Sequence, residues 1–130
     1  MYIPWVKAAQ LFKDGQYDEA LEVYIDLFHN KKFRGSTFYI LLLKLRLNKL
    51  EGFKMYYKDG MEYTQASTRF FILDEIFETY QTADPVVIEE FKNDLIDCTD
   101  NEDHPLIEDV LDSLHIIARD RNTQNMLDED

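Results

Sequence analysis

The sequence has few of the residues that define several classes of protein. It contains one cysteine, Cys98, which excludes both a scaffold stapled by disulfides within the chain and a zinc site built from several thiolates. No apolar run approaches the roughly 18 residues that a membrane span requires. The first residues lack the basic-then-apolar pattern of a signal peptide. We therefore expect a soluble cytoplasmic protein that does not contact a membrane.

Glycine and proline are also scarce, with four and three residues, and they separate stretches that have the apolar period of a helix. This spacing predicts an all-α fold. With 45% hydrophobic and 14% aromatic residues, the 130-residue chain can build one core, since folding at this length buries about two thirds of the surface of the unfolded chain. We predict one helical-repeat domain over residues 1–118 and an acidic, frayed C-terminal tail over residues 119–130.

Seven helices are expected, over about residues 4–13, 17–29, 38–50, 51–63, 67–81, 85–97 and 105–118. Gly15 suits the left-handed residue that ends a helix, and Pro85 and Pro105 each suit the first helical position. The third helix is apolar on nearly all sides, which predicts that its neighbours cover it in the middle of the domain. The short connections favour three antiparallel hairpins followed by a C-terminal capping helix.

The formal net charge of −12 is divided unevenly along the chain. Residues 1–30 carry two basic and five acidic side chains, residues 31–64 carry eight and three, and residues 65–130 carry four and eighteen. The middle of the chain is therefore basic and the C-terminal half is strongly acidic. Such an acidic region repels nucleic acid and anionic lipid and attracts basic partners, although an acidic surface can also serve solubility alone.

One short pattern recurs along the chain. Residues 15–24, GQYDEALEVY, place a small residue, Ala20, one turn before an aromatic residue, Tyr24, as two closely crossing helices require. This segment resembles the junction and second helix of a tetratricopeptide repeat, whose period is about 34 residues. An unrelated all-helical bundle is the alternative. The same pairing recurs 32 residues later and, more weakly, after a further 35, at Gly52 with Tyr56 and at Val87 with Phe91.

The resemblance implies a non-enzymatic protein-protein interaction module, an adaptor or chaperone-like protein. In such arrays the first helix of each pair lines a concave groove that binds a peptide or helix of a partner. Basic groove residues could pair with an acidic peptide or a C-terminal carboxylate, or they could be ordinary solvated charges. The groove candidates in this chain are Lys7, Gln10, Tyr39, Lys44, Asn48 and Arg69.

The acidic C-terminal half supports an alternative function. Carboxylates spaced along two adjacent helices can imitate a row of phosphates, so the protein could be an acidic inhibitor or nucleic-acid mimic that occupies a basic surface of a target protein. Self-association is a third alternative, because a short helical array leaves apolar edges at its ends. The candidate residues of the acidic surface are Glu89, Glu90, Asp94, Asp97, Asp100, Glu102, Asp103, Glu108, Asp109 and Asp112.

We find no set of residues that indicates an enzyme, a cofactor or a metal. The three histidines lie far apart without the His-Glu-x-x-His spacing, and four scattered glycines form no phosphate-binding loop. A calcium loop over residues 97–108 is rejected, because Glu102 stands where the turn needs glycine and Pro105 falls in the second half.

The basic middle of the chain also contains aromatic residues, a combination found in nucleic-acid-binding surfaces. Helical spacing assigns these aromatics to the core, and a net charge of −12 opposes binding to phosphates. We therefore expect a protein or peptide partner and no nucleic acid. The aromatic residues concerned are Phe33, Tyr39, Tyr56 and Tyr57.

Overall fold

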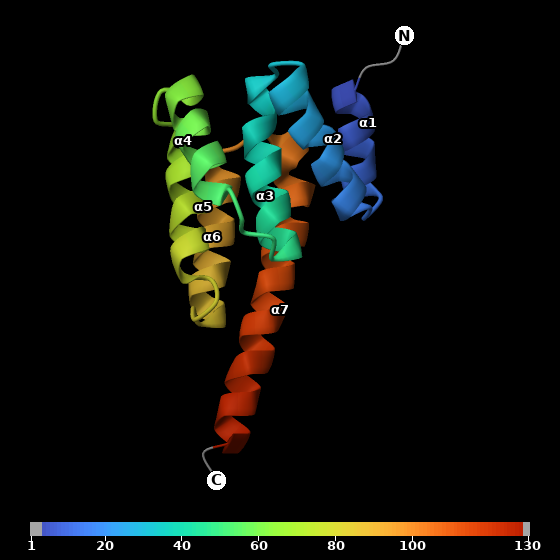
Figure 1. Cartoon of the computed structure of the whole chain (residues 1–130). Coiled ribbons are helices and arrows are strands. Elements are labelled where there is room, and N and C mark those ends of the chain that lie inside the picture. Colours follow the sequence, from blue (N-terminus) through green and yellow to red (C-terminus); the bar gives the residue numbers. More distant parts are fainter. Residues whose placement is uncertain (1–3, 129–130) are drawn as a thin grey trace. The chain divides into compact units, whose positions relative to one another are not determined.

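The computed structural model describes residues 4–128, with the side chains of residues 5–124. This part of the chain folds into seven α-helices and two short 3-10 helices, with no strand, which confirms the predicted all-α class. In chain order (Figure 1) the elements are α1 (Pro4–Lys13), α2 (Tyr17–Asn30), η1 (Arg34–Ser36), α3 (Thr37–Leu47), α4 (Phe53–Thr64), α5 (Thr68–Thr79), α6 (Pro85–Asp97), η2 (Asn101–Asp103) and α7 (His104–Asp128).

The helices divide into two compact units, which we call unit 1 (residues 1–71) and unit 2 (residues 72–130). The division falls inside α5. One domain over residues 1–118 stays a prediction, and the division into units was not foreseen because helical periodicity shows which face of a helix is apolar but not which other helices it packs against. The division also separates the charges: unit 1 carries eleven basic and eight acidic side chains, and unit 2 carries three and eighteen.

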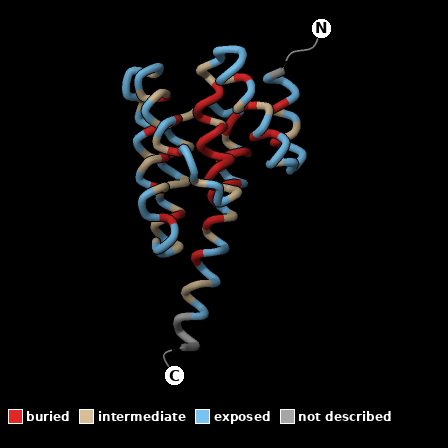
Figure 2. The backbone as a smooth tube through the Cα atoms, in the orientation of Figure 1, coloured by how far each residue is buried: buried red, intermediate tan, exposed pale blue. Residues whose placement is uncertain are grey.

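Unit 1 is built from consecutive helices that pack on one another, α1 on α2, α2 on α3 and α3 on α4 (Figure 1). Its centre is α3, in which eight of eleven residues are buried (Figure 2). This agrees with the prediction that the third helix is covered by its neighbours. In α2 the predicted close-packing pair is also buried, with Ala20 at 0% and Tyr24 at 2% exposure.

The turn between α3 and α4 is longer than predicted. The third helix ends at Leu47 because Asn48 takes a left-handed conformation, with φ 55°, and the Lys49 amide donates to the Lys44 carbonyl at 2.9 Å. Gly52, at φ 77°, precedes α4. The sequence analysis placed Gly52 inside the fourth helix as the small member of a repeat pair, whereas the structure uses it as a turn residue, since glycine adopts positive φ without strain.

A different glycine allows the close approach that α4 makes. Gly60 is buried, and a Cβ built on it would lie 2.2 Å from Cε1 of Phe70 in α5. The Phe70 ring in turn packs against Phe38 of α3 at 6.0 Å between centroids. Any side chain at position 60 would therefore displace a fully buried ring.

In unit 2, α6 packs on α7. Buried side chains of this pair include Ile88, Leu95, Ile107 and Leu111, each at 0% exposure. The helix α7 continues to Asp128, whereas the sequence analysis expected it to end near residue 118 and the tail to fray. Residues 119–128 lack glycine and proline, and the Arg121 guanidinium donates to the Ala83 carbonyl just before α6. Residues 129–130 of the predicted tail lie outside the described residues.

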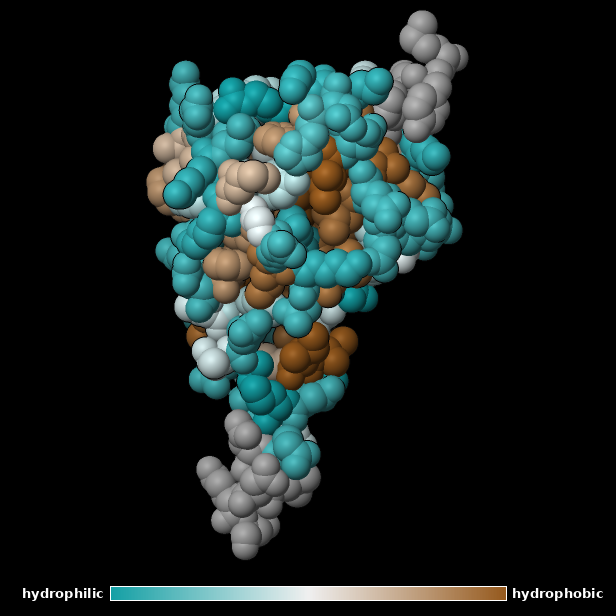
Figure 3. All heavy atoms as spheres, viewed as in Figure 1, coloured by the Kyte–Doolittle hydropathy of each residue, from teal (hydrophilic) through white to brown (hydrophobic). Residues whose placement is uncertain are grey.

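Figure 3 shows that the visible face is largely hydrophilic, with apolar atoms gathered in limited areas, one over α1–α3 and one on α7. Among the described side chains of α7, the large apolar ones that are exposed are Ile116 and Ile117, at 48% and 55% exposure. Within the described part of the chain, every helix is too short or too polar to cross a bilayer.

Candidate functional site

The surface of unit 1 contains a hollow of about 360 Å³ with apolar walls, which we call the aromatic pocket; it is lined by Trp5, Leu27, Lys31, Lys32 and Phe33. Trp5 and Phe33 are 51% and 38% exposed, and their rings lie 5.8 Å apart at an interplanar angle of 41°. Two large aromatic side chains therefore share one exposed site, with two lysines at its edge.

The turn after α2 positions one wall of the pocket. Lys32 has φ 57°, a left-handed conformation that is uncommon for a lysine. This conformation reverses the chain, so that the Phe33 amide donates to the Leu27 carbonyl at 2.9 Å. The hydrogen bond satisfies a carbonyl at the end of α2 and brings the Phe33 ring to the same hollow as the Leu27 side chain.

Gly35 determines how the Phe33 ring lies. A Cβ at Gly35 would be 3.3 Å from both Cε2 and Cζ of Phe33, a contact that few real Cβ atoms make. The absence of a side chain thus allows the phenyl ring to rest close to the backbone of η1. Trp5 supplies the facing ring from the first turn of α1.

A second hollow of about 230 Å³, which we call the polar pocket, adjoins the aromatic pocket through a shared residue, Lys32; its other lining residues are Phe28, His29, Arg34 and Asp59. Of these lining residues, His29 also contacts α4, since its Nε2 lies 2.8 Å from the Tyr56 hydroxyl. Burial raises the pKa of the Tyr56 hydroxyl, because the charged form would be poorly solvated there. The two hollows together join an apolar surface to a charged one.

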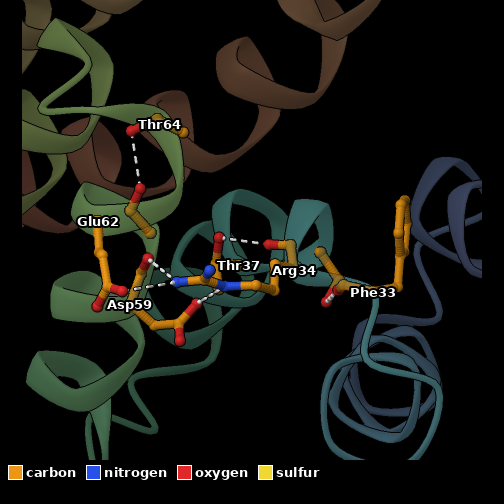
Figure 4. Close-up of polar contacts among 8 residues, drawn as sticks. Phe33, Arg34, Thr37, Asp59, Glu62 and Thr64 are labelled. Atoms are coloured by element: carbon orange, nitrogen blue, oxygen red, sulfur yellow. Dashed lines mark hydrogen bonds and ion pairs between the residues drawn. The ribbon is translucent and has the colours of Figure 1, made fainter.

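The Arg34 guanidinium is held by α4 (Figure 4). Its Nε donates to the Asp59 carboxylate at 3.0 Å, its Nη2 donates to the Asp59 carbonyl at 3.3 Å, and the Glu62 carboxylate lies 3.9 Å away. The hydrogen bond to Asp59 raises the pKa of Arg34. Figure 4 also shows that Phe33 and Arg34, although adjacent in the chain, point to opposite sides. The charge of Arg34 is thus largely balanced by α4, and Lys31 and Lys32 provide the positive charge at the rim.

The structure does not bring the six predicted groove residues together as one surface. Lys7 and Gln10 are exposed on α1, where the Gln10 amide donates to Asp14 at 2.8 Å. The other side chains are used in packing or in a turn. Tyr39 stacks on Tyr24 at 5.1 Å between centroids, Arg69 lies 4.3 Å above the Phe38 ring, and Asn48 is the left-handed residue that ends α3.

Lys44 was predicted to face the groove, and this prediction is wrong. Its exposure is 7%. Its Nζ donates to the Glu51 carbonyl at 2.6 Å and lies 5.5 Å from the Tyr56 ring centroid. Burial lowers the pKa of Lys44, and Glu51 partly offsets this effect. The aliphatic stem of a lysine can be buried while its charged end makes a hydrogen bond. The Lys44 ammonium group therefore links α3 to the turn between α3 and α4 through the Glu51 carbonyl.

The predicted acidic surface lies on the α6–α7 pair and on η2 between them. Eight of its ten members are exposed and Glu89 is half-buried. Lys92 of α6 pairs with Glu89 at 3.1 Å and with Asp112 of α7 at 2.9 Å. These hydrogen bonds, to Asp112 above all, raise the pKa of Lys92. Lys92 thus neutralises part of the acidic surface and also links α6 to α7.

Asp103 does not belong to the exposed acidic surface, contrary to the prediction. It is 6% exposed and precedes the first residue of α7. A carboxylate at this place faces the positive end of the helix dipole, which stabilises the start of the helix. The sequence analysis counted Asp103 with its acidic neighbours because it did not identify it as the residue before the helix.

Sequence reasoning missed Trp5 and assigned Phe33 to the core. The available signal was composition, since Trp5 is the single tryptophan of the chain and stands beside the first proline. Phe33 lies outside the helices, in the turn before η1, so the helical spacing used to assign it to the core did not apply to it. Tyrosine 56, which the same argument assigned to the core, is buried at 5% exposure.

In the described part of the chain, no group of three or more His, Cys, Asp or Glu side chains is arranged to hold a metal ion. The site of interest is therefore the joined aromatic and polar pockets of unit 1. Comparison of the chain with protein-family models, with curated proteins and with solved structures finds no match.

Proposed function

We propose that this chain is a non-enzymatic protein-protein interaction module, adaptor or chaperone-like, that binds a peptide segment of a partner at the aromatic pocket of unit 1. One observation carries the proposal: Trp5 and Phe33 form an exposed aromatic pair over a hollow. Exposed apolar sites that are rimmed by polar residues mark interaction surfaces, and tryptophan and other aromatic anchors contribute most to binding energy in such surfaces.

The proposal keeps the tetratricopeptide-like interpretation for unit 1 but moves the binding site. The consecutive packing of α1 to α4 supports a short array of helix pairs. In the predicted groove only the first helix of each pair would contribute. Here Trp5 comes from α1, whereas Leu27, Lys31, Lys32 and Phe33 come from α2 and the turn that follows it.

Selection of peptides from a random display library on the immobilised full chain tests the proposal. Enriched peptides should bind the Phe33→Ala and Trp5→Ala variants about tenfold more weakly or worse, as expected for the loss of about 1.4 kcal/mol at an anchor. Met55→Ala is the matched control, because Met55 is 51% exposed on α4 of the same unit. Failure to enrich any peptide, or equal loss in all three variants, would show that the pocket is not a peptide-binding site.

A second candidate function belongs to unit 2, as an acidic surface that occupies a basic surface of a target protein. It is favoured by the excess of eighteen acidic over three basic side chains in this unit. A partner held in this way should bind at low salt and dissociate at about 0.5 M salt, where the Debye length is only a few ångströms. Glu90→Lys with Asp94→Lys should abolish its binding. Glu75→Lys with Asp120→Lys, which changes the net charge equally elsewhere in unit 2, should not.

A further inference from the structure

The two pockets of unit 1 share Lys32, so one ligand that occupies both would meet an apolar wall and then positive charge. From this arrangement we infer that the partner segment is an acidic peptide, in which one or two apolar side chains are followed directly by carboxylates. The inference rests on the proposed function and specifies its ligand class.

The aromatic pocket sets the apolar part of this ligand. Its volume of about 360 Å³ is within the range of sites that bury small apolar groups. Three of its five lining residues are Trp5, Leu27 and Phe33, whose exposed apolar atoms gain most from contact with another apolar side chain. The exposed rings of Trp5 and Phe33 are tilted by 41° to each other, so no flat group can lie parallel to both, and a branched aliphatic side chain suits this lining better than a planar one.

The lysines at the rim set the acidic part. Lys31 and Lys32 are exposed and lie at the C-terminal end of α2. Asp59, which lines the polar pocket, and Glu62 are both directed at Arg34, and Asp26 accepts a hydrogen bond from Asn30. The negative end of the α2 dipole offsets part of the charge of these lysines. Their two ammonium groups still provide positive charge for the part of a bound peptide that extends beyond the aromatic pocket.

A nucleic acid fits this site less well. Bases stack on aromatic rings that offer a free parallel face, whereas Trp5 and Phe33 are tilted by 41° to each other over one hollow, so that a planar base cannot lie parallel to both rings.

Trp5 is the single tryptophan of the chain, so its fluorescence reports on the pocket directly. The probe is a blocked synthetic peptide that contains Leu-Leu-Asp-Glu-Asp, titrated into the full-length protein. We expect a saturable blue shift of Trp5 emission, because a leucine side chain displaces water from the indole. The amidated peptide Leu-Leu-Asn-Gln-Asn, in which side-chain amides replace the three carboxylates, should bind about fivefold more weakly, since two screened ion pairs are worth about 1 kcal/mol. A third peptide, Gly-Gly-Asp-Glu-Asp, lacks the apolar side chains and should not shift Trp5 emission.

Two double variants test whether Lys31 and Lys32 bind the carboxylates of the peptide. Lys31→Gln with Lys32→Gly should bring the affinity for the acidic peptide down to that for the amidated one; glycine is chosen because it accepts the positive φ of Lys32. Lys13→Gln with Lys58→Gln changes the net charge equally at two exposed positions of unit 1 and should leave the affinity unchanged. Urea unfolding of each variant, followed by Trp5 emission, verifies that the fold is retained.

Several results would overturn the inference. Equal affinity for the acidic and amidated peptides, or equal loss in both charge variants, would remove the role of Lys31 and Lys32 while leaving the proposed peptide binding intact. Stronger binding of an oligothymidylate than of the acidic peptide would assign the site to nucleic acid. A Trp5 emission maximum that shifts on dilution of the protein alone would assign the pocket to a second copy of this chain. If no display-selected peptide shifts Trp5 emission either, the proposed function fails as well.

Discussion

Units 1 and 2 are both helical, but their charged side chains are used differently. In unit 1 charged groups mainly fix the chain where helices turn: Arg34 binds Asp59, Lys44 binds the carbonyl of Glu51, and Lys49 of the α3–α4 turn binds Asp18. Unit 2 has eighteen acidic and only three basic side chains, and one of these three, Lys92, contacts two carboxylates. Charged side chains therefore stabilise turns in unit 1, whereas in unit 2 the excess of acidic side chains makes the surface strongly negative.

The comparison explains why the candidate site lies in unit 1. A binding pocket needs side chains held in place by their surroundings. The Phe33 ring is positioned by a backbone hydrogen bond to Leu27 and by the absence of a side chain at Gly35. In unit 2 most carboxylates of the predicted acidic surface are exposed, where they can attract a partner over distance.

The largest expected effect concerns the core of unit 1. Phe38→Ala should lower the free energy of unfolding by about 3–5 kcal/mol, because it removes a ring that is 1% exposed and packs on Phe70 and Tyr39. Urea unfolding followed by Trp5 fluorescence measures the change. Phe71→Ala is the control, at 47% exposure, and should cost less than about 1 kcal/mol. Equal effects would show that unit 1 does not have the tightly packed centre described above.

A smaller loss is expected at the close contact between α4 and α5. Gly60→Ala should destabilise unit 1 by up to about 2 kcal/mol, since overpacking against Phe70 costs about 1–3 kcal/mol and the better helix propensity of alanine returns about 1 kcal/mol. Combining Gly60→Ala with Phe70→Leu should cost less than the sum of the two single changes. A stabilised Gly60→Ala variant would mean that the two helices are not in close contact.

Each unit contains a lysine that pairs with a carboxylate of another element, Lys49 with Asp18 in unit 1 and Lys92 with Asp112 in unit 2. Lys92→Met should destabilise unit 2 by about 1 kcal/mol, because the Lys92 side chain is 18% exposed and loses two carboxylate partners. Lys49→Met removes an exposed pair in unit 1 and should cost only a few tenths of a kcal/mol. Hydrogen exchange of the α6–α7 amides reports the first change, and urea unfolding reports the second. The reverse order would contradict the view that unit 2 depends on its few cations.

The smallest expected effect is a difference in pH dependence between two lysines. Burial lowers the pKa of Lys44, so the unfolded chain holds that proton more tightly, and the Lys44 contribution to stability should rise as the pH increases toward about 10.4, the ordinary lysine value. Hydrogen bonds to Asp112 and Glu89 raise the pKa of Lys92. Its stabilising contribution should be complete below about pH 10.4 and should fall as the pH rises through the folded value.

The measurement is the stability of the wild-type chain minus that of Lys44→Met or Lys92→Met, taken from about pH 9 to about pH 11. The first difference should increase with pH and the second should decrease. Taking differences removes the titration of the tyrosines, which all three proteins share. Two differences that change in the same direction would show that the surroundings of one of the two lysines are misassigned.

Much of the fold could be predicted from local sequence. The bounds of α1 and α6 match the predicted 4–13 and 85–97; a proline is the first residue of each helix, and the left-handed Gly15 follows the end of α1. The end of α3 was missed, since a left-handed Asn48 is harder to predict than a left-handed glycine. The site was predicted poorly. Lys44 was assigned to a groove and is buried, whereas Phe33 was assigned to the core and is exposed.

By itself, the sequence determined the helical class, the number of helices and the separation of charge, because each depends on residue type and on spacing within one turn. Which side chains reach the surface at the turns depends instead on the packing of the helices. The Lys44 ammonium is drawn to a carbonyl seven residues ahead in the chain. Trp5 and Phe33, 28 positions apart, meet over one hollow because α1 packs on α2 and the chain reverses at Lys32. Contacts of this kind depend on how separate elements pack, which no local pattern records.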